Sequence, residues 1–141
     1  MYHYVREYDE SFPCLRFLDF YDFKKQLDVF QREYHFPTQT QLRKYLEGDD
    51  GALSTERPSM VLTFDDGLLD HYYYVLPELR RRGLWGIFYV PQGPYLSNEL
   101  LDVHMVHALL GRYDPAQLLK RTEMLLCTYE NGIRPDRVKE F

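Results

Sequence analysis

The chain has 141 residues, and its 17 basic and 22 acidic side chains give a formal net charge of −5 at pH 7. This length suits a single hydrophobic core, and 45% hydrophobic with 28% charged residues excludes a disordered or collagen-like chain. The excess of acidic residues gives no electrostatic reason to expect a nucleic-acid partner.

The N-terminal third predicts one short strand and two helices. Residues 2–5 are compatible with a strand. From residue 20 onward apolar side chains recur at steps of three and four, which predicts an amphipathic helix with Asp19 as its N-cap. A second short helix around residues 42–46 ends near a polar stretch, residues 48–58, that is rich in turn formers. We interpret this stretch as a linker inside one incomplete domain that covers residues 1–141.

The middle of the chain predicts a strand, a helix and a second strand. Residues 60–64 form a short, mostly apolar run that is typical of a buried strand. Residues 68–82 follow the helical period, and Pro77 predicts a kink or break just before it. Residues 84–90 form the next apolar run, which Pro91 ends.

The last part of the chain predicts two more helices. The first begins at Ser97 or Asn98, runs to residue 110 and is closed by Gly111. The second has Asp114 as its N-cap and ends near residues 131–132. Strands that alternate with helices indicate parallel strands joined by crossover helices, so the predicted fold class is α/β.

The sequence gives a few indications of cellular compartment. No stretch approaches the roughly 18 uninterrupted apolar residues of a membrane span, and the first residues lack the basic and apolar regions of a signal peptide. The two cysteines, Cys14 and Cys127, are simplest to interpret as buried reduced thiols, although one long-range disulfide is an alternative. We therefore expect a soluble cytoplasmic protein.

Two adjacent carboxylates, Asp65 and Asp66, follow the predicted strand 60–64 and precede Gly67. In parallel α/β folds this end of the sheet is where ligands and catalytic groups gather. Because neighbouring carboxylates repel each other, a divalent cation would stabilise the pair, with one carboxylate as ligand and the other as general base. The alternative is that one of them is simply the N-cap of the following helix.

His104 and His107 lie three residues apart and should share one face of a helix. Neutral imidazoles suit zinc, and together with Asp66 they would provide three ligands and leave one coordination position open for water. The alternative is a pair of half-exposed polar residues without a function.

The remaining histidines give weaker signals. His71 lies one turn into the predicted helix 68–82 and is a further candidate, although it needs no function if it faces solvent. For His3 and His35 we favour structural roles.

The string Thr63-Phe64-Asp65-Asp66-Gly67 resembles the first motif of the polysaccharide deacetylase family, the NodB-like carbohydrate esterases. The apolar run before it, the helix after it, the strand Gly86-Ile87-Phe88-Tyr89-Val90 and the opening Tyr2-His3-Tyr4-Val5 follow the order usual in that family. The resemblance covers most of this chain but only the N-terminal portion of a family domain. It implies a partial or truncated distorted (β/α) barrel.

The resemblance also implies an activity: a metal-dependent hydrolase that removes N-acetyl groups from an amino sugar or polysaccharide precursor. Asp65 would be the catalytic base, and Asp66, His104 and His107 would hold a divalent metal, with zinc the first choice. The partner would be an N-acetylated carbohydrate. One alternative is a truncated, non-catalytic metal- or carbohydrate-binding remnant of such an enzyme, and another is a purely structural α/β domain.

The sequence departs from the family pattern in two ways. The family's two ligand histidines are spaced by four residues, whereas His104 and His107 are spaced by three. The later family motifs, including the Leu-His that carries the catalytic acid, are not found, so the acid has no candidate. The chain would then be a fragment or a reduced relative, and a homo-oligomer or a further C-terminal segment would complete its open sheet.

Overall fold

The computed structural model describes residues 1–53 and 56–130, and the chain folds as two compact units. The first unit takes Met1–Tyr8 and Phe17–Asn98, and the second takes Asp9–Arg16 and the chain from Glu99 onward. The predicted linker, residues 48–58, falls within the first unit and includes the short helix η1 (Asp50–Leu53). None of the described helices combines the length and apolar character that crossing a bilayer would demand.

The first long helix confirms the sequence prediction. Helix α1 (Phe20–Glu33) begins after Asp19, whose carboxylate accepts a hydrogen bond of 2.7 Å from the Tyr21 N–H. Phe23 and Leu27, one helical turn apart, are completely buried. The helix therefore starts at its predicted cap and buries its predicted face.

The strands form two separate parallel pairs. Strand β3 (Leu62–Phe64) pairs with β4 (Gly86–Phe88), and β1 (Val5–Arg6) pairs with β2 (Leu18–Asp19). The chain start is joined to β3 by an isolated bridge between Tyr2 and Phe64. The fold is thus α/β with parallel pairing, but the described strands do not close a barrel.

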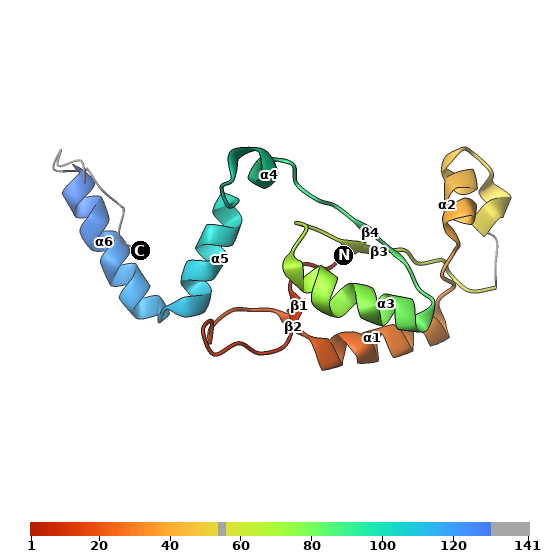
Figure 1. Cartoon of the computed structure of the whole chain (residues 1–141), viewed down its shortest axis with the longest axis horizontal. Helices are drawn as coiled ribbons and strands as arrows, with labels where there is room; N and C mark the ends of the chain where they lie inside the picture. The colour runs from red at the N-terminus through yellow and green to blue at the C-terminus, as the bar shows by residue number, and fades with distance from the viewer. Residues whose placement is uncertain (54–55, 131–141) are drawn as a thin grey trace. The chain divides into compact units, whose positions relative to one another are not determined.

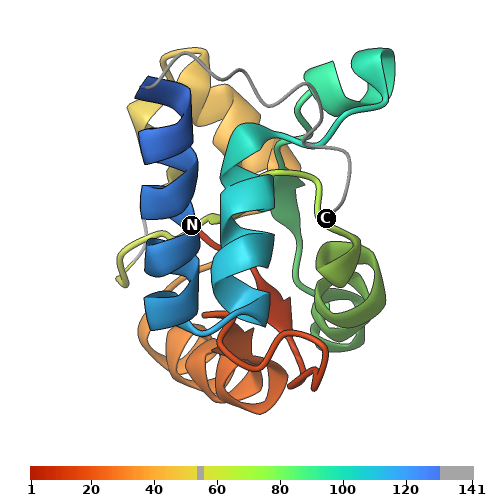
Figure 2. The same cartoon turned by 90° about the vertical axis from the view of Figure 1, so that its left-hand side faces the viewer.

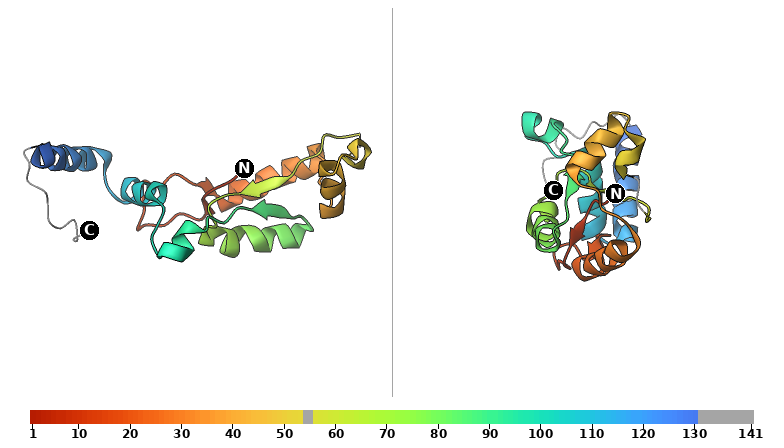
Figure 3. Two further views of the ribbon diagram at one scale, coloured as in Figure 1. Left: turned by 90° about the horizontal axis from the view of Figure 1, so that it is seen from above. Right: turned by 90° about the vertical axis from the view of Figure 1, so that its right-hand side faces the viewer.

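Two helical segments connect β3 to β4. A π-helix, η2 (His71–Val75), leads directly into α3 (Leu76–Arg82), so the helical segment changes from π- to α-winding just before Pro77 without an interruption. Gly83 ends α3 with a left-handed φ of 66°, as its position in the sequence predicts. Figures 1 and 3 show α1 and α3 running along the same side of the β3–β4 pair.

The core of the first unit lies between these helices and the strands. Rings from three segments stack in a row: the Tyr2 and Phe64 centroids are 5.5 Å apart, and those of Phe64 and Phe88 are 4.8 Å apart. The side chains buried at the centre are Val5, Phe23, Leu27, Leu62, Phe64, Val75 and Leu79. Burying this apolar surface fixes the position of β3 and of the residues that follow it.

Two short helices complete the first unit. Helix α2 (Gln39–Leu46) begins with a capping box in which the side chains of Thr38 and Gln41 bond reciprocally to backbone N–H groups. Helix α4 (Gly93–Ser97) ends at Asn98, whose φ is 56°. The predicted helix from residues 97–98 to 110 is therefore wrong at its start, because Asn98 terminates α4 instead of beginning the next helix.

The second unit contains α5 (Asp102–Arg112) and α6 (Pro115–Glu130), which meet at the short turn between them (Figure 2). Gly111 was expected to close α5 but lies inside it, where a Cβ atom would come within 2.9 Å of Leu15 Cβ. The predicted cap of α6 is confirmed by hydrogen bonds from two backbone N–H groups to the Asp114 carboxylate. The predicted end near residues 131–132 lies outside the described residues.

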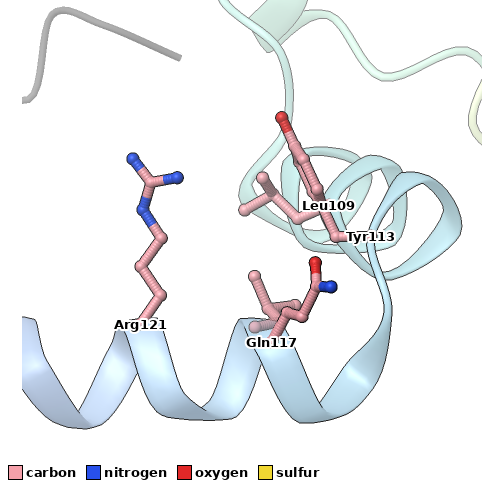
Figure 4. Close-up of a pocket in the computed structure, with 5 residues that line it drawn as sticks. Leu109, Tyr113, Gln117 and Arg121 are labelled. Atoms are coloured by element: carbon pink, nitrogen blue, oxygen red, sulfur yellow. The ribbon is translucent and has the colours of Figure 1, made fainter.

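The second unit also holds both cysteines and a small pocket. Cys14 and Cys127 are exposed and not joined by a disulfide, so the expectation that they are buried is wrong. The pocket has a volume of about 130 Å³ and opens between α5 and α6 (Figure 4). Its lining residues are Leu109, Tyr113, Gln117, Leu118 and Arg121.

Candidate functional site

A tight turn follows β3 and carries the two adjacent carboxylates. Asp66 and Gly67 both have left-handed backbones, with φ of 76° and 59°. Asp is one of the few residues other than glycine that visits this region. A Cβ atom on Gly67 would lie 3.0 Å from Val90 Cγ1, so the turn requires glycine for both its conformation and its space.

Asp65 is anchored by its backbone, and part of its carboxylate is buried. Its N–H donates a hydrogen bond of 2.9 Å to the Tyr2 carbonyl oxygen. Its Oδ1 atom is buried and has no hydrogen-bond partner among the described residues. A buried acceptor without a donor is costly unless a proton or a cation completes it, and this suits a proton acceptor or a neighbour of a metal.

The residue that precedes η2 is Asp70, and its side chain makes no capping hydrogen bond. The alternative in which Asp65 or Asp66 is the N-cap of the following helix stays a prediction.

The structure brings His3 to Asp66. The His3 Nε2 atom lies 3.8 Å from Asp66 Oδ2, and the two side chains are 44% and 25% exposed. Sequence reasoning favoured a structural role for His3 and missed this contact. The predicted strand at residues 2–5 could have indicated this contact. If it runs parallel to the strand 60–64, it places His3 near the carboxyl end of the strand 60–64.

Asp70 and His71 hold the same N-terminal segment. His71 is 4% exposed, so its interpretation as a solvent-facing residue is wrong, and its Nε2 atom lies 2.8 Å from the His3 carbonyl oxygen. Asp70 Oδ2 lies 3.8 Å from Arg6 Nε. Burial raises the pKa of Asp70, and the nearby Arg6 guanidinium opposes that rise.

His104 and His107 both lie on α5, in the second unit. Both are half-buried, whereas the intervening Met105 and Val106 are 44% and 51% exposed. The expectation that the two imidazoles share one helix face is therefore confirmed. The combination of these histidines with Asp66 draws on both units and stays a prediction.

The fit of a metal can be judged from the donors in the first unit. Asp66 provides a carboxylate and His3 an imidazole, both ordinary ligands of zinc. In the part of the chain that the structure describes, no three His, Cys, Asp or Glu side chains form a cluster that could hold a metal. A carboxylate donor fits a divalent cation, and a complete metal site around Asp66 needs further ligands.

Comparison with known proteins gives one informative likeness. No protein family model matches the chain. The structure is similar to that of a Streptococcus pyogenes deacetylase, PplD, solved in complex with acetate, with a TM-score of 0.55 and 19% sequence identity. The match covers 78% of this chain and 50% of the deacetylase, so the chain spans about half the length of that protein. The likeness shows a deacetylase-like α/β fold.

Proposed function

We propose that the chain carries the catalytic base and metal-binding residues of a hydrolase that removes N-acetyl groups from an amino sugar or a polysaccharide precursor. The observation that carries this proposal is the turn after β3, where Asp65 presents a buried carboxylate oxygen and Asp66 lies beside the His3 imidazole. The deacetylase-like fold supports the choice of reaction class.

The metal would be held by Asp66, His104 and His107. This donor set, one carboxylate and two neutral imidazoles, is typical of catalytic zinc. When bound, zinc would supply Lewis-acid polarisation of the acetyl carbonyl and a water that ionises readily. The left-handed backbone of Asp66 points to a turn shaped to present this carboxylate, since such a conformation is uncommon for a residue other than glycine.

Asp65 would act as the general base. The attacking water gives its proton to the Asp65 carboxylate while its oxygen forms the new bond to the acetyl carbon. The buried Oδ1 atom, without a donor in the described structure, can accept that proton without breaking an existing hydrogen bond.

His3 is our candidate for the proton donor that the sequence did not reveal. When the carbon–nitrogen bond breaks, the departing amine needs a proton, and the products are acetate and the free amino sugar. The His3 imidazole is partly exposed, lies beside Asp66 and can donate from either ring nitrogen when protonated. These features support His3 as the acid.

The test is acetate release from oligomers of N-acetylglucosamine by the full chain, with zinc and with a chelator. We expect zinc-dependent release, because attack by the water that Asp65 deprotonates needs an acetyl carbonyl polarised by the metal. The double variant His104→Ala, His107→Ala should lose zinc affinity, and the neighbouring exposed Met105→Ala should not. Acetate release that persists in the chelator would contradict the metal-dependent reaction.

The second candidate is a non-catalytic metal- or carbohydrate-binding remnant. The match to only 50% of the deacetylase supports it, because the other half of an active site could lie in the part without a counterpart here. This candidate predicts zinc uptake without acetate release. A chain that binds neither zinc nor the oligomers would instead be a structural α/β domain.

A further inference from the structure

His71 is a buried polar residue whose imidazole forms a hydrogen bond with the backbone of His3. It is 4% exposed, and its ring packs against Phe64 and Phe88 with centroids 5.5 and 5.9 Å apart. Because a carbonyl oxygen only accepts, the 2.8 Å contact with the His3 carbonyl places the His71 proton on Nε2. An apolar side chain would fill this space without burying a polar atom, so the hydrogen bond to His3 is what the imidazole adds.

The acceptor of this hydrogen bond belongs to the residue beside Asp66. The backbone before His3 is already attached to β3, because the Tyr2 N–H donates to the Thr63 carbonyl at 2.8 Å and the Asp65 N–H donates to the Tyr2 carbonyl at 2.9 Å. The His71 hydrogen bond adds a third attachment, at the His3 carbonyl itself, and a fourth follows it, where the Leu18 N–H donates to the Tyr4 carbonyl at 3.0 Å.

The His3 side chain depends on these backbone attachments. It is 44% exposed, so packing restrains it little, and its place 3.8 Å from Asp66 Oδ2 follows from where its backbone is held. Without the third attachment the His3 peptide could rotate and carry the imidazole away from the carboxylate. A displacement of about 1 Å at a reacting group can cost about 100-fold in rate.

We infer that His71 is a positioning residue that holds the His3 imidazole beside Asp66 through the His3 carbonyl. The inference rests on the proposed function for its effect on catalysis, because there His3 is the proton donor. The geometric part, that His71 fixes the place of the His3 ring, is independent of any activity.

The first measurement therefore uses the metal-free full chain. In His71→Leu, which fills the space but cannot donate, the His3 ring signals in a ¹H–¹³C NMR spectrum should move to the positions of a freely exposed imidazole. In His71→Gln, whose amide N–H can donate to the carbonyl, they should stay near the wild-type positions. If His71→Leu does not fold, His71→Asn, whose shorter amide falls short of the carbonyl, carries the same expectation as His71→Leu.

A core variant of the same helix separates positioning from general loss of stability. Val75→Ala removes a fully buried side chain from η2 and should lower stability without moving the His3 signals. Unchanged His3 signals in His71→Leu, or equal changes in Val75→Ala, would overturn the inference.

The second measurement is a double-mutant cycle on acetate release. His71→Leu should lower kcat about 10- to 100-fold with little change in KM, and in a His3→Ala background it should have no further effect. A loss of the same size in both backgrounds would mean that His71 acts on stability alone, which would overturn the positioning role. If the wild-type chain releases no acetate, the proposed function fails, and the NMR measurement still decides whether His71 positions His3.

Discussion

The His3 imidazole lies beside the Asp66 carboxylate, with 3.8 Å between Nε2 and Oδ2, although the two residues come from the start and the middle of the chain. The contact exists because the first residues bridge to β3 at Phe64, just before the turn that carries Asp66. An ionisable side chain from the chain start is thus part of the candidate site.

Asp66→Asn should weaken zinc binding by at least about 10-fold, because changes outside the ligand shell alone can cost 10- to 100-fold. Asparagine tolerates the left-handed backbone at this position, so the turn should stay folded and the loss should report the missing charge. Calorimetric titration with zinc measures the effect. Asp22→Asn, on an exposed carboxylate of α1, is the matched control, and equal affinities for the two variants would exclude Asp66 as a ligand.

Asp65→Asn should lower kcat for acetate release by about 10²- to 10⁴-fold, the range expected for loss of a general base. Zinc affinity should stay close to that of the wild type, since Asp65 is proposed as the base and not as a ligand. Measurements of kcat and of zinc affinity on the same preparation test whether the variant lowers the rate alone. Full activity in Asp65→Asn would remove Asp65 from the mechanism.

Glu78→Gln should destabilise the fold at neutral pH and have little effect in acid. The Glu78 side chain is 6% exposed, and hydrogen bonds from Arg81 and Arg82 lower its pKa from 4.5 to about 2. Because the folded-state pKa is the lower one, the stabilisation is complete above 4.5 and is lost as the pH falls toward 2. The shift sets an upper bound of about 3 kcal/mol on this contribution to the unfolding free energy, because solvent around the exposed Arg81 screens part of it.

Urea unfolding of wild type and Glu78→Gln at pH 7, 4 and 2.5 measures this dependence. The difference between the two proteins should shrink steadily as the pH is lowered. Glu47→Gln, on a 68% exposed side chain, should show little difference at any of these pH values. A Glu78→Gln effect that is constant with pH would contradict the charge-based explanation.

Gly86→Ala should destabilise the first unit by about 1–3 kcal/mol, the usual cost of overpacking. A Cβ atom there would lie 2.7 Å from Phe64 Cε2 and 3.1 Å from the Leu62 carbonyl oxygen, which belongs to the paired strand and cannot move freely. At Gly93 the same atom would meet nothing within 4 Å, so Gly93→Ala should be close to neutral. Equal unfolding free energies for the two variants would show that β3 and β4 pack less tightly than described.

Local sequence signals predicted the elements whose ends depend on near neighbours. Asp19 begins α1, Pro77 follows the change from π- to α-winding, and Gly83 ends α3, because caps and proline geometry act over a few residues. Gly111 shows the limit of such signals. Its position suggested a helix end, but the close approach of Leu15, from a distant part of the chain, is what requires a glycine there.

The candidate site also combines residues that local sequence signals predict with residues that only long-range contacts place. Asp65, Asp66 and Gly67 were found from their order after an apolar run, which is local information. The place of His3 depends on which strand the chain start joins, and that pairing is a long-range contact that spacing does not reveal. His71 was misjudged because its burial comes from contacts with Phe64 and Phe88 on the two strands, which helical spacing does not reveal.

The π-helix at His71–Val75 has a consequence for changes in chain length. A π-turn accommodates one residue more than a regular helix would, because wider winding takes up the extra residue without turning the flanking residues. Deleting a single residue such as Tyr73 should therefore restore regular winding and leave the Asp70–His71 end close to its present orientation relative to Leu79. A change of one residue in the length of this segment is thus compatible with keeping the link between His71 and His3.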